Sequence, residues 1–269
     1  MTTDPMTTDP VVTDPVVTDP LVTNPVVTDP VVTDPVVTDP LVTNPVVTDP
    51  VVTDPVVTNP MTACDRLFQE AFDALPLMAI LRGFDPQRTV EVSRRAWEAG
   101  IRLVEVPVQS DAAVVALEAA VAAGEERGAV VGAGTVTTLD RVEQAVAAGA
   151  RFTVAPGFSR EIAEASLAAG LPHLPGVATA TEIQQAQALG LNWLKAFPAA
   201  DLGSGWITAM AGPFPAARFV ATGGMGLKNT LEFLDAGAAA VSLGSALADP
   251  AQFERLPELI EHIDRKAQR

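Results

Sequence analysis

Residues 173–198 read HLPGVATATEIQQAQALGLNWLKAFP, in which two short apolar runs flank an amphipathic stretch. The runs at 173–175 and 193–197 have the length and composition of buried strands. The stretch at 181–189 has the apolar spacing of a helix, and Gly190 follows it as glycine commonly follows a helix C-terminus. The segment therefore predicts one strand-helix-strand unit.

The same alternation extends in both directions along the chain. Strand candidates lie at residues 77–81, 103–108, 129–132, 152–155, 173–175, 193–197, 218–221 and 240–243. Helical patterns lie between them, for example at 86–99, 139–148 and 161–169. Eight strands alternating with helices predict a parallel (β/α)8 barrel, the TIM-barrel architecture. The alternative, a doubly wound open sheet, would place a Gly-x-Gly-x-x-Gly turn after its first strand, and that turn is absent.

Residues 1–60 differ sharply in composition and consist of twelve pentapeptides of the type Val-Val-Thr-Asp-Pro. Each proline removes a backbone donor and disfavours the helical conformation of the residue before it. We therefore expect a disordered or extended tail, with stacked short strands as the alternative. Ordinary complexity resumes at Met61, so we expect residues 61–269 to form the functional barrel and the tail to be dispensable.

Charge and cysteine content exclude several classes of function. The formal net charge is −16, and nine of these charges are aspartates of residues 1–60. No basic cluster is present that could neutralise a nucleic-acid backbone, so we expect no nucleic-acid partner. The single cysteine, Cys64, rules out a disulfide within the chain and fits a reducing cytoplasm. Since there is neither a signal-peptide pattern nor a long apolar run, we expect a soluble cytoplasmic protein without membrane contact.

Lys195 is the one lysine of three that lies inside an apolar strand candidate. Burying an ammonium group is costly unless the group is paired or gives up its proton. A neutral lysine amine is a nucleophile that forms Schiff bases with ketones. The structural alternative is a lysine that reaches water at the strand end or pairs with a carboxylate.

Other polar residues stand at the ends of the strand candidates, which face the active site in a barrel. Arg82 follows the first candidate, and Glu105 interrupts the second as Lys195 interrupts the sixth. Together they could supply a carboxylate clamp, a proton shuttle and a nucleophile. Glycine turns at 222–224 and 244–245 follow the last two candidates, where barrels commonly bind phosphate. Each feature also has a structural reading: an ion pair between Glu105 and Lys195, a rim arginine without a ligand, and ordinary tight turns.

The motifs at these positions resemble one family. Residues 75–250 resemble the 2-keto-3-deoxy-6-phosphogluconate and 2-keto-3-deoxy-6-phosphogalactonate aldolases, which are class I enzymes. The matching stretches are Ala79-Ile80-Leu81-Arg82-Gly83, Val104-Glu105-Val106-Pro107, Val131-Gly132-Ala133-Gly134-Thr135-Val136, Pro156-Gly157, Pro175-Gly176-Val177-Ala178-Thr179-Ala180-Thr181-Glu182, Leu194-Lys195-Ala196-Phe197-Pro198-Ala199, Thr222-Gly223-Gly224 and Gly244-Ser245. The resemblance implies a TIM barrel that cleaves a phosphorylated keto-deoxy sugar acid without a metal or other cofactor, and a homotrimer.

The resemblance also implies roles for individual residues. Lys195 would form the Schiff base and Glu105 would move protons. The residues implied at the pyruvyl end are Arg82, Thr135, Gln109, Pro156 and Phe197, and those implied at the phosphate are Thr222, Gly223, Gly224, Gly244 and Ser245.

The stretch Glu-Val-Pro-Val-Gln-Ser at 105–110 bears on the substrate. Gluconate-type enzymes commonly carry an arginine four residues after the glutamate, where this chain has Gln109. The pattern is more similar to the galactonate type, so we expect cleavage of 2-keto-3-deoxy-6-phosphogalactonate to pyruvate and glyceraldehyde 3-phosphate. The gluconate epimer and 4-hydroxy-2-oxoglutarate are the alternatives.

Three rival functions use the same barrel. A metal-dependent aldolase would have to do without a histidine cluster, because His173 and His262 are the only histidines, and an acidic magnesium site is the form that stays open to it. A phosphate-binding isomerase or epimerase would bind sugar phosphates but would not trap pyruvate. A non-catalytic role, with the repeat tail as the working part, would leave without an explanation the complete set of Arg82, Glu105, Thr135 and Lys195.

Overall fold

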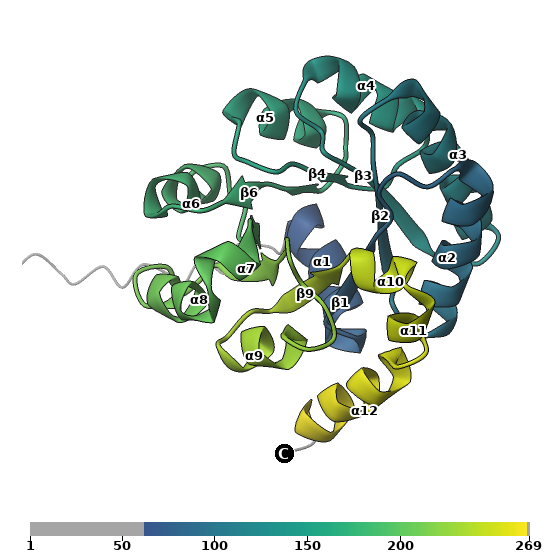
Figure 1. The fold of residues 1–269 in the computed structure, drawn as a ribbon. Coiled ribbons are helices and arrows are strands. Elements are labelled where there is room, and N and C mark those ends of the chain that lie inside the picture. The colour runs from purple at the N-terminus through teal and green to yellow at the C-terminus, as the bar shows by residue number, and fades with distance from the viewer. Residues whose placement is uncertain (1–61, 268–269) are drawn as a thin grey trace, which may run out of the picture. The chain divides into compact units, whose positions relative to one another are not determined.

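The computed structural model describes residues 62–267, so the predicted tail lies outside the described residues. The described part is a barrel of parallel strands surrounded by helices, which confirms the predicted fold class (Figure 1). The strands are β1 (Leu77–Ile80), β2 (Leu103–Pro107), β3 (Val130–Gly134), β4 (Thr153–Val154), β5 (His173–Leu174), β6 (Gly176–Val177), β7 (Trp193–Ala196), β8 (Arg218–Ala221) and β9 (Ala240–Leu243). Their order in the sheet is β5-β4-β3-β2-β1-β9-β8-β7-β6.

The fifth predicted strand, at 173–175, is not continuous. Pro175 separates β5 from β6, because proline has no N–H to donate to a ladder. β5 pairs with β4 and β6 pairs with β7, while the carbonyl of Pro175 accepts a hydrogen bond of 2.8 Å from the Lys195 N–H. The segment 173–177 therefore joins the two ends of the strand order and closes the barrel.

Most other predicted boundaries agree with the structure to within two residues. The third strand is later than predicted, at Val130–Gly134 instead of 129–132, because its pairing with β2 continues to the register partners Pro107 and Gly134. The outer helices are α2 (Pro86–Glu98), α3 (Asp111–Glu125), α4 (Leu139–Ala147), α5 (Arg160–Ala168), α6 (Ala180–Gln187), α7 (Ala199–Leu202), α8 (Ser204–Ala211), α9 (Thr230–Asp235), α10 (Ser245–Ala248), α11 (Pro250–Phe253) and α12 (Leu256–Ala267).

An additional helix, α1 (Ala63–Ala74), precedes the barrel and was not among the predicted elements. Its aromatic side chains pack against residues at the amino ends of the strands. Phe68 lies 5.8 Å from Phe152 in an edge-to-face pair, and Phe72 lies 5.3 Å from Trp193, measured between ring centroids. α1 therefore covers the amino end of the barrel and leaves the carboxyl end open.

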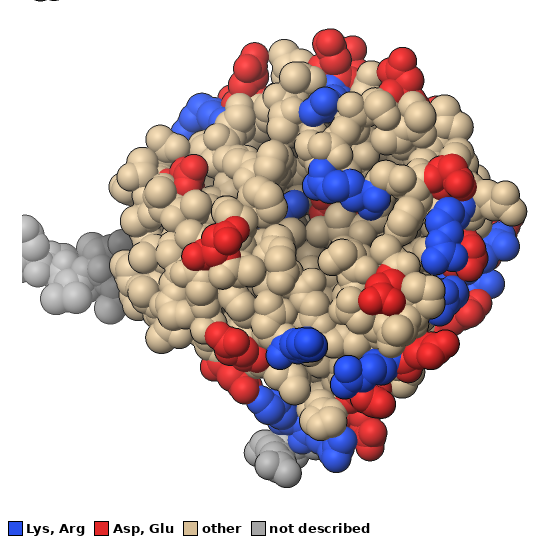
Figure 2. All heavy atoms as spheres, in the orientation of Figure 1, with Lys and Arg blue, Asp and Glu red and all other residues tan. Residues whose placement is uncertain are grey.

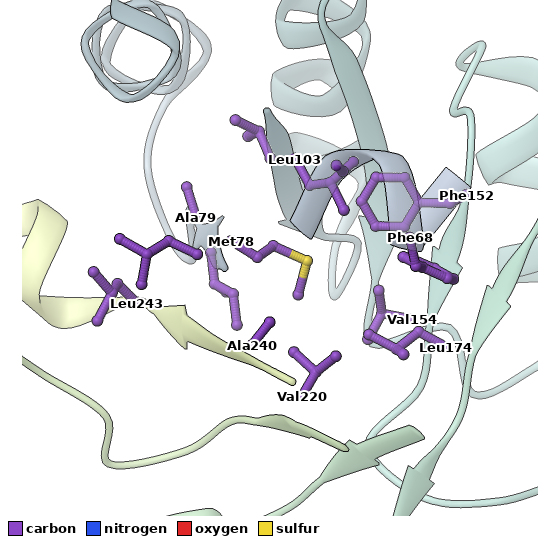
Figure 3. Close-up of a cluster of buried hydrophobic side chains, with 14 of the residues drawn as sticks. Phe68, Met78, Ala79, Leu103, Phe152, Val154, Leu174, Val220, Ala240 and Leu243 are labelled. Atoms are coloured by element: carbon purple, nitrogen blue, oxygen red, sulfur yellow. The ribbon is translucent and has the colours of Figure 1, made fainter. Parts of the chain in front are cut away.

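The barrel interior is filled with apolar side chains. Met78 from β1, Val220 from β8 and Ala240 from β9 are buried in this core, and Phe68 lies beside Phe152 (Figure 3). A packed interior gives a rigid floor to any site at the carboxyl ends of the strands.

Three polar residues form a small buried cluster under α1. The His173 N–H donates to Sγ of Cys64 at 3.4 Å, and Nδ1 of His173 lies 2.8 Å from Oγ1 of Thr153. Burial lowers the pKa of His173 to about 4, and burial also raises the pKa of the Cys64 thiol. Both groups are therefore neutral near pH 7.

None of the helices in the range 62–267 combines the length and the apolarity that crossing a membrane requires.

Candidate active site

Lys195 of β7 and Glu105 of β2 meet inside the barrel. Lys195 Nζ lies 3.7 Å from Glu105 Oε1, and the two side chains are 4% and 0% exposed. Neither carboxylate oxygen of Glu105 has a hydrogen-bond partner among residues 62–267. Because 3.7 Å exceeds hydrogen-bond length, both groups keep their hydrogen-bonding capacity for a ligand.

Gly134 of β3 makes room for Glu105. A Cβ atom at position 134 would lie 2.0 Å from Oε1 of Glu105 and 2.6 Å from its Cδ, so the carboxylate rests directly on the glycine backbone. Thr135 follows at the strand end and is half-buried. The predicted proton shuttle thus packs against the residue that precedes the predicted carboxylate binder in the chain.

Arg82 and Gln109 are hydrogen-bonded at the rim of the barrel mouth, where they follow two adjacent strands. Arg82 follows β1, Gln109 follows β2, and Nη1 of Arg82 donates to Oε1 of Gln109 at 2.6 Å. Both side chains are exposed. The hydrogen bond fixes one edge of the guanidinium and leaves its remaining donors free to bind a carboxylate.

A cavity of about 590 Å³ opens at this end of the barrel. It brings together eight of the predicted site residues: Arg82, Lys195, Phe197, Thr222, Gly223, Gly224, Gly244 and Ser245. Figure 2 shows Lys and Arg side chains beside a hollow near the centre of the face in view. One cavity therefore joins the predicted nucleophile to both predicted phosphate turns.

Four predicted site residues do not line this cavity: Glu105, Gln109, Thr135 and Pro156. Glu105 and Gln109 contact lining residues, as described above. Pro156 follows β4, and its backbone lies so close to Gly176 that a Cβ there would come within 2.2 Å of the Pro156 carbonyl. Pro156 therefore contacts Gly176 through its backbone at the end of β4.

The turn after β8 needs glycine at both positions. Gly223 and Gly224 have φ values of 92° and 69°, in the left-handed region that glycine adopts without strain. A Cβ on Gly224 would also lie 2.5 Å from Cβ of Ala200. The N–H groups of Ala199 and Ala200 donate to the carbonyls of Thr222 and Gly223, which ties this turn to the segment after Lys195.

Five lining residues were missed by sequence reasoning: Ile80, Phe84, Met225, Ser242 and Ala248. Ser242 could have been predicted, because it is a polar residue in the otherwise apolar strand β9. Glu105 in β2 and Lys195 in β7 stand out in the same way. It lies 3.0 Å from the hydroxyl of Thr222, which donates to it. The apolar residues carried no such signal, because they differ in no way from core residues.

Within residues 62–267, no group of three or more His, Cys, Asp or Glu side chains is arranged to hold a metal ion.

Known proteins are similar to this chain in sequence and in fold. A family model described as "Aldolase: KDPG and KHG aldolase" matches residues 68–259. A 2-dehydro-3-deoxy-phosphogluconate aldolase of Treponema pallidum is 38% identical over 185 residues, covering 68% of this chain and 85% of that protein. A 2-dehydro-3-deoxy-6-phosphogalactonate aldolase of Escherichia coli is 34% identical over 174 residues, covering 64% and 84%.

A solved structure adds chemical detail. It is a KDPG aldolase from Legionella pneumophila with pyruvate captured at low pH as a covalent carbinolamine intermediate. It matches with a TM-score of 0.62 and 31% identity, covering 71% of this chain and 94% of that one. The protein is accordingly a carbon–carbon lyase that belongs to the KDPG and KHG aldolase family.

Proposed function

We propose that the protein cleaves 2-keto-3-deoxy-6-phosphogalactonate to pyruvate and glyceraldehyde 3-phosphate through a Schiff base on Lys195. The observation that carries this proposal is the buried pair of Lys195 and Glu105, which adjoins the same cavity as Arg82 and the two glycine turns. A carboxylate-binding end at Arg82, a nucleophile and a phosphate-binding end fit the two anionic termini and the keto carbon of such an acid.

The chemistry follows from the positions of the two groups. The neutral amine of Lys195 attacks C2 of the keto acid, and Glu105 transfers the protons needed to expel water from the carbinolamine. The iminium withdraws electrons from C3, so the C3–C4 bond breaks when the C4 hydroxyl loses its proton. The enamine then takes a proton at C3, and water hydrolyses the imine to release pyruvate and regenerate Lys195.

Binding at the two ends would orient the substrate for this chemistry. Arg82 would hold the carboxylate next to C2, with Thr135 beside it. The backbone N–H groups of the turns at 223–224 and 244–245 would bind the terminal phosphate, since such turns present several donors to one anion. Phe197, whose ring centroid lies 5.3 Å from Lys195 Nζ, would exclude water from the amine.

Gln109 supports the galactonate epimer. Gluconate-type enzymes commonly carry an arginine at this position, and here Gln109 instead accepts a hydrogen bond from Arg82. The residue that binds the substrate carboxylate would thus be Arg82, which follows β1, and not a residue that follows β2. The gluconate epimer is the second candidate, because the Treponema pallidum relative at 38% identity is a phosphogluconate aldolase. 4-Hydroxy-2-oxoglutarate, which lacks a phosphate, would leave the glycine turns unused.

Two measurements test the proposal. Steady-state cleavage of both phosphorylated epimers and of 4-hydroxy-2-oxoglutarate should give the highest kcat/KM for the galactonate epimer; a higher value for another substrate would overturn that preference. Borohydride reduction with pyruvate should add mass at Lys195 and abolish activity. Lys195→Ala should lose the adduct, whereas Lys228→Ala, at an exposed lysine, should keep it. An adduct of equal yield in Lys195→Ala would contradict the assignment of the nucleophile.

The expected homotrimer is a separate proposal. Light scattering of the purified protein would test it, and a monomer at micromolar concentration would refute it.

A further inference from the structure

Thr135 has an unusual backbone conformation. Its φ of 59° is the only positive value for a residue other than glycine within residues 62–267. A β-branched side chain makes the left-handed region unfavourable, so surrounding contacts must hold such a residue in place. Gly134, the residue before it, is the one on which the Glu105 carboxylate rests. The strain is therefore located next to the proposed proton shuttle.

Arg141 of α4 is one of the contacts that hold this conformation. Its Nη1 donates to the carbonyl of Thr135 at 3.1 Å and to Oγ1 of Thr137 at 2.6 Å. The N–H of Val136, in the same peptide group as that carbonyl, donates to the carbonyl of Val154 at 3.0 Å. Both polar atoms of the peptide after Thr135 are thus anchored, which restricts rotation about the strained residue.

The position of Arg141 in the first turn of α4 does not favour the helix itself. It is the third residue after the N-cap Thr138, and the corresponding residues of α1 and α6 are the acids Asp65 and Glu182, which complete capping boxes. A guanidinium near a helix N-terminus opposes the helix dipole. This local cost indicates that Arg141 serves the residues it contacts outside the helix.

Arg88 provides a comparison within the same chain. It is the third residue after the N-cap Asp85 of α2, and it pairs with Glu91 at 2.7 Å on the same helix. Arg141 has no ion pair within residues 62–267, and its donors go to Thr135 and Thr137. The two arginines occupy equivalent helix positions, but Arg141 alone of the two reaches a predicted site residue.

We propose that Arg141 is a positioning residue that holds Thr135 in the left-handed conformation needed to bind the pyruvyl carboxylate. The proposal rests on the proposed function, which assigns that role to Thr135. Arg141 contacts no substrate and acts through the carbonyl of Thr135. Its loss should weaken binding of every ligand with a pyruvyl carboxylate, whichever aldehyde the substrate releases.

The test compares Arg141→Met, Arg141→Lys and the control Arg88→Met. The readouts are the pyruvate concentration that half-saturates borohydride trapping, and KM and kcat for the preferred substrate. Arg141→Met should raise the half-saturating concentration and KM about tenfold with a smaller change in kcat, as expected for loss of one charge-assisted hydrogen bond. Arg141→Lys, which keeps the charge and hydrogen-bond donors but not the planar guanidinium, should recover part of the loss. Arg88→Met should match the wild type.

A double-mutant cycle shows whether Arg141 acts through Thr135. Glycine adopts a φ of 59° without strain, so Thr135→Gly should no longer need the arginine. In that background Arg141→Met should change pyruvate trapping less than about twofold, a coupling that a merely structural role would not produce. Thermal melting of each variant distinguishes misfolding from loss of binding. If Arg141→Met does not fold, Arg141→Lys replaces it in the cycle.

Several results would overturn the proposal. They are unchanged trapping in Arg141→Met, an equal loss in Arg88→Met, and additive effects of Arg141→Met and Thr135→Gly. A wild-type protein that forms no adduct with pyruvate would overturn the Schiff-base function itself, and this proposal with it.

Discussion

Lys195 Nζ lies 3.7 Å from Glu105 Oε1, at the bottom of a barrel mouth and almost wholly shielded from solvent. The distance is too long for a hydrogen bond, and the site around both groups is poorly solvated. Removing one member of the pair therefore changes the surroundings of the other as well as the chemistry.

Glu105→Gln should reduce aldol cleavage about 10²- to 10⁴-fold, the usual contribution of a positioned acid-base group. The amide keeps the shape of the side chain but cannot exchange protons with the carbinolamine. The check is kcat at saturating substrate together with the rate of borohydride trapping, and both should fall. Glu164→Gln, at an exposed carboxylate of α5, should leave both unchanged. Full activity in Glu105→Gln would remove the carboxylate from the mechanism.

Gly134→Ala should disable the site sterically. The added Cβ would lie 2.0 Å from Oε1 of Glu105, so the carboxylate must move from its place beside Lys195. We expect a large loss of kcat and a destabilisation of about 1–3 kcal/mol, typical of overpacking. Gly205→Ala is the control, because a Cβ there meets nothing within 4 Å. Equal kcat in the two variants would show that the position of Glu105 does not matter.

Gln109→Leu should weaken substrate binding more than turnover. It removes the acceptor that holds Arg82 at 2.6 Å, so the guanidinium becomes free to rotate. We expect KM to rise several-fold, with kcat reduced less. Gln109→Arg should lower the kcat/KM ratio of galactonate over gluconate epimer, since it restores the residue common in gluconate-type enzymes. A ratio that does not change in Gln109→Arg would separate Gln109 from epimer selection.

His173 should make the fold sensitive to acid. Burial lowers its pKa to about 4 in the folded protein, whereas an unfolded histidine titrates near 6.5. Because the folded pKa is depressed, the folded state is fully favoured above pH 6.5 and loses stability as the pH falls from there towards 4. The linkage amounts to about 3 kcal/mol at most.

Urea unfolding at pH 7 and pH 5 checks this expectation. His173→Asn, which can still bond to Thr153, should show a smaller loss of stability between the two pH values than the wild type. His262→Gln, at an exposed histidine of α12, should lose as much as the wild type. If His173→Asn keeps the full pH dependence, another group must carry it.

Deletion of residues 1–60 should leave kcat/KM and the melting temperature unchanged. The family match begins at residue 68, and the cap of α1 at Thr62 is retained in the shortened chain. Activity assays and thermal melts of both chains test this. A shortened chain that is inactive or melts several degrees lower would assign the repeats a function.

The barrel was predictable because its signal is local. Each strand is an apolar run and each helix an amphipathic stretch, so period and length alone recovered eight of the nine strands, and β6 was missed. α1 was missed although Cys64, Phe68 and Phe72 recur at helical spacing, because a helix before the first strand is not part of the alternation. The break at Pro175 was readable from the missing N–H of proline, but its use in closing the sheet depends on pairing with both β4 and β7.

The main candidate site residues could also be named from the sequence, because an arginine, a glutamate and a lysine are conspicuous at apolar strand ends. The contacts between these residues could not be predicted from the sequence. The 3.7 Å approach of Lys195 to Glu105 and the Arg82–Gln109 hydrogen bond join residues far apart in the chain. Such contacts depend on strand register and side-chain rotamers, which no local pattern encodes. The sequence therefore determined the fold and the chemical groups, whereas the tertiary structure alone decided that Glu105 rests on Gly134 and that Arg141 reaches back to a strained Thr135.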